Sequence, residues 1–284
     1  MQMIIPPAAA ESVFSIGHFS ITNSLINGWI AVIFFVVVAL VLRKRQNAIP
    51  KGIQNFAEAT LEFMLTEIQK VTGDAKRARQ FLPIIGTLFL FILFSNWIGL
   101  FPGTGSIGVW GMHHGAVALI PLLRPAASDM NFTLAIAAFA VITSHVIGFR
   151  NMGGMNHFSK FINIRGLWRG LKKGPIAFLV AIIELVVGLI ETIGEISKVA
   201  SLSLRLFGNI FAGEVLITVI LGLFAFFMPI PFMFLEILVG AVQATVFSML
   251  TLAYLTVATT PHDHEEEHDE SHEPHTEPST AHAA

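Results

Sequence analysis

The 284-residue sequence contains no cysteine and few charged residues, and each shortage excludes a class of protein. Without cysteine the chain can form no disulfide framework, no thiol nucleophile and no zinc–thiolate site. Only 13% of its residues are charged and 54% are hydrophobic, whereas about a quarter of the residues of a soluble domain carry a charge. This composition predicts a membrane protein, with the lipid bilayer as its surroundings.

Positive charge is absent from the last 79 residues, because Arg205 is the final basic residue of the chain. The tail that begins at Pro261 holds eight of the nineteen acidic residues, so the rest of the chain carries a net charge of +6. This tail has six histidines and no large apolar residue, and we expect residues 259–284 to be disordered. Weak metal binding or proton buffering by the tail is the less favoured alternative. The first residues lack the pattern of a cleaved signal peptide and are expected to form a mature N-terminus.

Five apolar segments are long enough to cross the apolar core of a bilayer, about 30 Å thick, as helices. The fourth, with 52 residues, would reach about 78 Å, so we expect it to be broken or steeply tilted. The proline-containing segment 227–231 then returns the chain, and the last two helices should form a hairpin. The sequence therefore predicts one membrane domain over residues 1–258, with helices at 24–42, 81–101, 130–149, 175–226 and 232–258.

A sixth helix is predicted at 53–71, where apolar residues recur at helical spacing and lie opposite Glu58, Glu62 and Glu67. It should lie on the membrane surface or against a partner protein. Basic residues mark the cytoplasmic side: the loop 43–80 has eight, the loop 150–173 has six, and the loop 102–129 has only Arg124. We therefore expect an all-α polytopic membrane protein whose N-terminus is outside and whose C-terminus is cytoplasmic.

One face of the predicted helix 175–226 carries a row of polar side chains, at 100° per residue. The row comprises Glu184, Glu191, Glu195, Lys198, Arg205 and Asn209. A charge at mid-bilayer depth costs roughly 2.5 to 3.5 kcal/mol, so an ordered row implies water or partners. Glu195 and Lys198 are close enough to neutralise each other, and Glu184 suits a membrane interface. The acids on the face of Arg205 lie two or more turns away, so we assign Arg205 a functional role.

The returning helix adds Glu236 and Gln243, which share one face because they are seven residues apart. Glu214 lies away from the row, nearer the turn between the two helices. His145, late in the third helix, fits a hydrogen-bonded structural residue better than a proton relay.

Three stretches resemble subunit a of rotary ATP synthases, the stator of the membrane sector: SKVASLSLRLFGNIFAGE (197–214), VQATVFSMLTLAYL (242–255) and FSNWIGLFPG (94–103). The likeness extends over about residues 20–258. In that family two long tilted helices face a ring of c-subunits, each with one membrane-embedded carboxylate. Protons enter through one half-channel, ride on the ring and leave through the other.

The resemblance implies that Arg205 faces the ring and that Gln243 sits opposite it. It places three residues in the outer half-channel: Glu214, Glu236 and Asn96. It places four residues at the inner exit: Ser201, Asn209, Glu191 and Glu195. Many relatives pair a histidine with a glutamate where this chain has two acids, and two neighbouring acids are expected to share a proton.

Two other interpretations compete with this one. The polar row could be the ion site of a self-contained secondary transporter or antiporter, although the sequence shows no inverted repeat or paired interrupted helices. A purely structural anchor would leave Arg205, Asn209 and Gln243 unexplained. The stator interpretation implies, as partners, the c-ring, peripheral-stalk b subunits and the rest of ATP synthase, in a bacterial plasma membrane. It implies no catalysis by this chain, no cofactor, no metal and no nucleic acid, and we favour H⁺ over Na⁺.

Overall fold

The computed structural model describes residues 7, 9–17, 19–44, 50–101, 103–104, 107–113, 116–152, 175–224 and 227–259. These residues form six α-helices, two β-hairpins and a short 3-10 helix. Four of the helices are long and apolar enough to cross a membrane. The all-α polytopic fold class is therefore confirmed. The acidic tail from residue 260 and most of the second basic loop lie outside the described residues.

The first three membrane helices lie close to the ranges that the sequence predicts. They are α1 (Asn23–Lys44), α3 (Ala75–Ile98) and α4 (Met130–Met152). Helix α3 begins before its predicted start at residue 81, because Asp74 caps it: the Asp74 side chain accepts a hydrogen bond from the backbone N–H of Lys76 at 2.9 Å. The basic residues that follow Asp74 thus belong to the helix, although they are not apolar.

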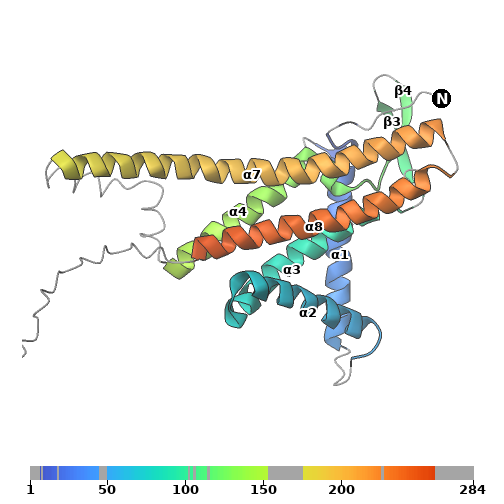
Figure 1. Cartoon of the computed structure of the whole chain (residues 1–284). Helices are drawn as coiled ribbons and strands as arrows, with labels where there is room; N and C mark the ends of the chain where they lie inside the picture. The colour runs from blue at the N-terminus through green and yellow to red at the C-terminus, as the bar shows by residue number, and fades with distance from the viewer. Residues whose placement is uncertain are drawn as a thin grey trace, which may run out of the picture.

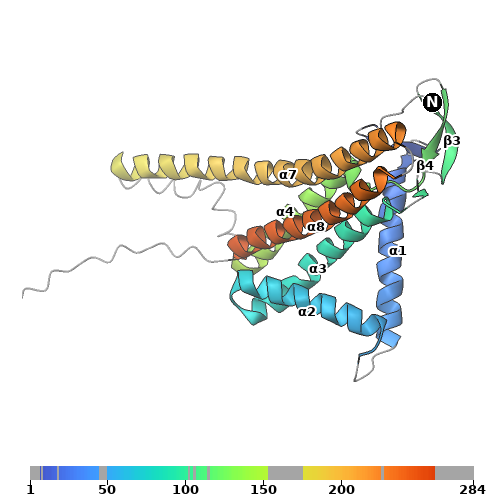
Figure 2. The same cartoon turned by 45° about the vertical axis from the view of Figure 1, so that its right-hand side comes forward.

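The last two helices are α7 (Pro175–Leu223) and α8 (Pro229–Thr259), and they form a hairpin. Helix α7 is continuous over 49 residues, about 74 Å, so it is not broken. Figures 1 and 2 show α7 lying across the direction of α1, with α8 beside its C-terminal half. If α1 crosses the bilayer upright, α7 is therefore steeply tilted. Helix α7, with 49 residues, is longer than any of the four apolar spans.

The main core lies where α3, α4, α7 and α8 meet. Helix α7 contributes Leu202, Leu206 and Ile210, which repeat every four residues on one face and pack against α4 and α8 residues such as Ala137 and Phe247. Because that face of α7 is buried, the face that carries Leu204 and Arg205 points outward.

Helix α2 (Ile53–Thr72) packs on α3 through the buried side chains of Met64 and Ile68. Its other apolar residues, including Ile53, Phe56 and Phe63, are exposed. This is the amphipathic helix that the sequence predicts, and an exposed apolar edge suits either a membrane surface or a partner.

Two antiparallel hairpins complete the structure: β1 (Ser12–Ile16) with β2 (Phe19–Thr22), and β3 (Gly108–His113) with β4 (Ala116–Pro121). Figures 1 and 2 place β3 and β4 at the end of the molecule where α7 meets α8. From β4 the chain runs through Arg124 to the 3-10 helix η2 (Ala126–Ser128), which packs against α7 and α1. This connection brings the basic residue of the outer loop to the α7–α8 hairpin.

Candidate functional site

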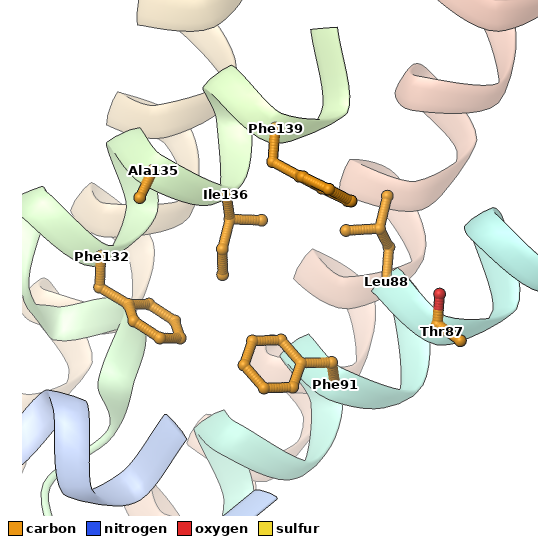
Figure 3. A pocket seen from close by; sticks show the side chains of 7 residues that line it. All are labelled: Thr87, Leu88, Phe91, Phe132, Ala135, Ile136 and Phe139. Carbon is orange, nitrogen blue, oxygen red and sulfur yellow. The ribbon is translucent and has the colours of Figure 1, made fainter. Parts of the chain in front are cut away.

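A pocket of about 410 Å³ between α3 and α4 is lined almost entirely by apolar side chains (Figure 3). The lining residues are Thr87, Leu88, Phe91, Phe132, Ala135, Ile136 and Phe139. The only hydroxyl among them belongs to Thr87, and it donates to the carbonyl of Pro83 in its own helix at 2.6 Å. The pocket thus offers nothing that would bind an ion, and the polar groups that could do so lie on α7 and α8.

Arg205 lies in the middle of α7 on its outward face, together with Ser201 and Asn209. Among the residues that the structure describes, no carboxylate lies within 4.0 Å of its guanidinium. Guanidinium groups stay charged at any working pH. The chain therefore presents a permanent positive charge that its own described acids do not neutralise.

Asn209 links α7 to α8 one turn beyond Arg205. Its Nδ2 donates a hydrogen bond to Oε1 of Gln243 at 2.7 Å. The Gln243 side chain is buried, and its Nε2 has no hydrogen-bond partner in the described part of the chain. Gln243 is thus tied to the residue one turn beyond Arg205, and its Nε2 remains available as a hydrogen-bond donor within the described residues.

The two acids of the predicted outer half-channel, Glu214 and Glu236, come together at the end of the hairpin. A side chain on Gly213 would overlap the Glu236 carboxyl group, so this carboxyl group lies directly on α7 beside Glu214. Glu236 is only 5% exposed, and its Oε1 makes no hydrogen bond to any described residue. Gly213 is the residue that makes room for it.

Asn96, on α3, approaches α8 in the same region. Its Cβ lies 3.5 Å from the place that a Cβ on Gly240 would take, one turn from Glu236. Asn96 is buried, and neither polar atom of its amide is hydrogen-bonded within the described residues. Buried polar groups nearly always have a partner, and in an apolar setting an ordered water is a common one.

A second polar cluster lies toward the start of α7. Glu195 accepts from Nζ of Lys198 at 2.6 Å, and its other oxygen lies 3.2 Å from Nε2 of His145 on α4. The Lys198 ammonium also sits over the ring of Tyr254 on α8, 5.1 Å from the centroid. Residues of three helices thus meet around Glu195 and Lys198, with His145 in contact with Glu195. Glu191, one turn earlier on α7, is exposed.

Arg205 therefore lies about midway between two acidic clusters on one continuous helix. Glu214 follows it by nine residues, about 14 Å along the axis, and Glu195 precedes it by ten, about 15 Å. The structure brings Asn209 and Gln243 together, and Glu214 and Glu236 together, but it leaves both clusters well separated from the arginine.

Sequence reasoning missed Arg124, which forms an ion pair with Glu214 at 2.7 Å. It treated Arg124 only as the single basic residue of the outer loop. Arg124 is the one charged residue of the apolar stretch 116–127, and this is a usable signal because buried charges are almost always paired, although it does not identify the partner. Gly213 and Tyr254 gave no comparable signal.

Comparison with known proteins assigns the family. The family described as ATP synthase A chain matches residues 25–256. The chain is 29% identical over 252 residues to ATP synthase subunit a of Moorella thermoacetica, covering 89% of this chain and 96% of that protein. It is 32% identical over 233 residues to ATP synthase subunit a of Citrifermentans bemidjiense, covering 82% and 86% of the two chains. For ATP synthase subunit a of Campylobacter jejuni the identity is 33% over 224 residues, covering 79% and 84%.

The match runs from residue 25, in α1, to residue 256, in α8, and includes both polar clusters of α7. Together with the apolar spans, it identifies a multi-pass membrane protein that takes part in ion transport and ATP synthesis. This chain belongs to the ATP synthase A chain family, the subunits a of the ATP synthase membrane sector.

Proposed function

We propose that this chain is the stator that leads protons to and from a ring of c-subunits through two half-channels, with Arg205 between them. The observation that carries the proposal is the position of Arg205. It is exposed in the middle of α7, it has no acid partner among the described residues, and it stands about 15 Å from an acidic cluster on either side.

A fixed guanidinium can discharge the acids of a passing ring. At 4 Å and an effective dielectric constant near 20, it stabilises a carboxylate by about 4 kcal/mol. A c-subunit acid that approaches Arg205 therefore releases its proton, and it can take up another only after it has moved on. The same positive charge repels protons that would otherwise pass directly between the two half-channels.

The outer half-channel in this proposal consists of Glu214, Glu236 and Asn96. The buried Oε1 of Glu236 and the amide of Asn96 have no hydrogen-bond partner within the described chain, which suits groups that line a path for water. The inner exit consists of Glu191, Glu195, Ser201 and Asn209, where Glu191 and Ser201 are exposed on α7.

The chain itself makes no covalent chemistry in this scheme, and catalysis belongs to the partner head of the complex. Its direct partners are the c-ring and the peripheral-stalk b subunits. The basic loops favour a bacterial plasma membrane orientation with the N-terminus outside and the C-terminus in the cytoplasm. We propose H⁺ as the ion.

The contact with the ring can be tested by cross-linking, because this chain has no cysteine of its own. Leu204, next to Arg205, and Val36 on α1 are each 52% exposed. In the whole ATP synthase, Leu204→Cys should form a disulfide with a cysteine placed beside the carboxylate of the c-subunit. The matched variant Val36→Cys, equally exposed on another helix, should not.

The proposed arrangement would be contradicted by an intact complex in which Leu204→Cys forms no disulfide with the c-subunit, or no more of it than Val36→Cys forms. A purified chain that transports ions without any other subunit would favour the self-contained transporter instead.

A further inference from the structure

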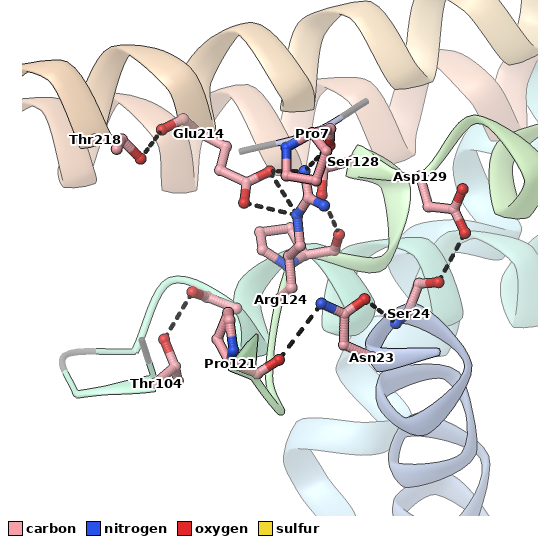
Figure 4. Close-up of polar contacts among 12 residues, drawn as sticks. Pro7, Asn23, Ser24, Thr104, Pro121, Arg124, Ser128, Asp129, Glu214 and Thr218 are labelled. Carbon is pink, nitrogen blue, oxygen red and sulfur yellow. Dashed lines mark hydrogen bonds and ion pairs between the residues drawn. The ribbon is translucent and has the colours of Figure 1, made fainter. Parts of the chain in front are cut away.

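Arg124 and Glu214 form a two-point ion pair across 90 residues of sequence (Figure 4). Nε of Arg124 donates to Oε1 of Glu214 at 2.7 Å and to Oε2 at 3.0 Å, and Nη2 donates to Oε2 at 2.9 Å. The Arg124 side chain is only 4% exposed. A bidentate pair of this kind is among the strongest charged hydrogen-bond arrangements in proteins.

Neighbouring elements hold Arg124 in place. Its Nη2 also donates to the carbonyl of Pro7 at 2.8 Å, and its own carbonyl accepts from Nδ2 of Asn27 on α1 at 2.6 Å. The next residue, Pro125, packs so closely on Gly99 that a Cβ there would overlap its ring. The backbone at Arg124 is therefore held by α1 and by the end of α3, and its guanidinium is held by Glu214 and the N-terminal segment.

The acid nearest to Arg124 in the sequence, Asp129, does not compete for it. Asp129, at the start of α4, accepts from the hydroxyl of Ser24 at 2.7 Å (Figure 4). It also accepts from the backbone N–H of Asn131 at 3.1 Å. Arg124 thus has one carboxylate partner within the described residues, and that partner is Glu214.

Glu236 lies beside Glu214 but, unlike Glu214, has no basic partner among the described residues. Its carboxyl group rests on the backbone of Gly213, and no basic side chain of the described residues lies within 4.0 Å of it. Of the two neighbouring acids, one is neutralised by a fixed cation and the other is not. A carboxylate that is held by a guanidinium stays ionised, whereas an unpaired buried carboxylate can readily take up a proton.

We infer that Arg124 is a positioning residue of the outer half-channel, which holds Glu214 as a fixed carboxylate and leaves Glu236 as the acid that carries the proton. A hydronium ion from outside protonates the Glu236 carboxylate and leaves water. Glu236 then gives this proton, through water, to a c-subunit carboxylate and is ionised again. The charges of Arg124 and Glu214 do not change. The inference rests on the proposed function and replaces the expectation that the two acids share a proton.

The test compares four variants of the whole ATP synthase in inverted membrane vesicles. They are Arg124→Gln, Glu214→Gln, the double variant R124Q/E214Q, and Glu236→Gln. ATP-driven proton pumping is measured with a pH-sensitive dye and divided by the amount of assembled complex. Each single change at 124 or 214 should lower pumping by about tenfold or more, because it leaves one buried charge unpaired beside Glu236.

The double variant removes both charges and leaves two neutral amides that can hydrogen-bond to each other, so it should recover most of the pumping. Glu236→Gln should abolish it. Arg124→Lys, which keeps the charge but loses the two-point contact, should pump severalfold better than Arg124→Gln. Rescue by the doubly neutral variant would show that Glu214 need not carry a proton.

A double variant that does not pump, or does not assemble, would overturn the inference, because a proton-carrying Glu214 cannot be replaced by glutamine. Equal loss in Arg124→Lys and Arg124→Gln would overturn it as well, since charge would then not matter. The variant Arg205→Ala distinguishes a failure of this inference from a failure of the proposed stator function. If that variant is inactive, the stator function stands whatever the outcome at Glu214, and if it pumps normally, the proposed function itself is wrong.

Discussion

Replacing Arg205 by alanine is the sharpest test of the proposed function, because the structure predicts little other damage. The guanidinium has no described carboxylate within 4.0 Å, so its removal leaves no acid of this part of the chain unpaired. The side chain is on the exposed face of α7, so its removal opens no cavity in the core. The variant should therefore assemble with the other subunits at the normal level.

The expected loss follows from the charge. If a c-subunit carboxylate passes within about 4 Å of the guanidinium at an effective dielectric constant near 20, it loses about 4 kcal/mol of stabilisation in the variant. A change of 1.36 kcal/mol is tenfold in rate, so the deprotonation step should slow by about a thousandfold. Lysine at this position keeps the charge but loses it readily on burial, so Arg205→Lys should be only a partial substitute.

The assay is ATP-driven proton pumping in inverted vesicles, with synthesis measured in the same membranes and both divided by the assembled complex. Lys70→Ala is the control, because Lys70 is an exposed cation on α2 whose ion pair with Glu67 is a surface pair of little energetic weight. The control should pump normally. Pumping by Arg205→Ala within about twofold of the parent would refute the electrostatic reasoning, because the missing charge predicts a far larger loss.

Three further changes and one control test the packing of the helices. Gly213→Ala should displace the Glu236 carboxyl group, because the added methyl group overpacks the contact at a cost of about 1 to 3 kcal/mol. Pumping should then fall by about fivefold or more. Gly86→Ala, whose Cβ would meet only ordinary contacts, should pump normally. Asn27→Leu removes two buried hydrogen bonds between α1 and its neighbours, so the purified complex should melt at a lower temperature, by a loss of about 1 to 3 kcal/mol. Ile68→Ala opens a cavity between α2 and α3, at about 2 to 5 kcal/mol, and limited proteolysis should then cut α2 faster.

The helices of this protein follow from its sequence because their causes are local. Apolar runs of sufficient length specify spans wherever the chain meets lipid, and spacing of 100° per residue places Arg205 and Asn209 on one face of α7 whatever surrounds it. The amphipathic helix α2 follows in the same way from apolar and acidic residues that fall on opposite faces of one helix. Its predicted range, 53–71, differs from Ile53–Thr72 by one residue.

The start of α3 shows where local reasoning is limited even for a single helix. The apolar run begins at residue 81, but the helix begins at Ala75, because the Asp74 cap and the basic residues after it extend the helix beyond the lipid. Hydrophobicity marks what lies in the membrane, and the cap marks where the helix begins.

The pairing of charges was decided by tertiary structure. Arg124 and Glu214 are 90 residues apart, and nothing in the periodicity of either segment brings them together. Their contact depends on η2 packing against α7, just as the contact of His145 with Glu195 depends on α4 packing against α7. A sequence specifies which side chains share a face of one helix, but only the packed helices specify which side chains of different elements neutralise each other, because that depends on crossing geometry and depth. The distinction between a paired acid, Glu214, and an unpaired one, Glu236, is a property of the packed helices alone.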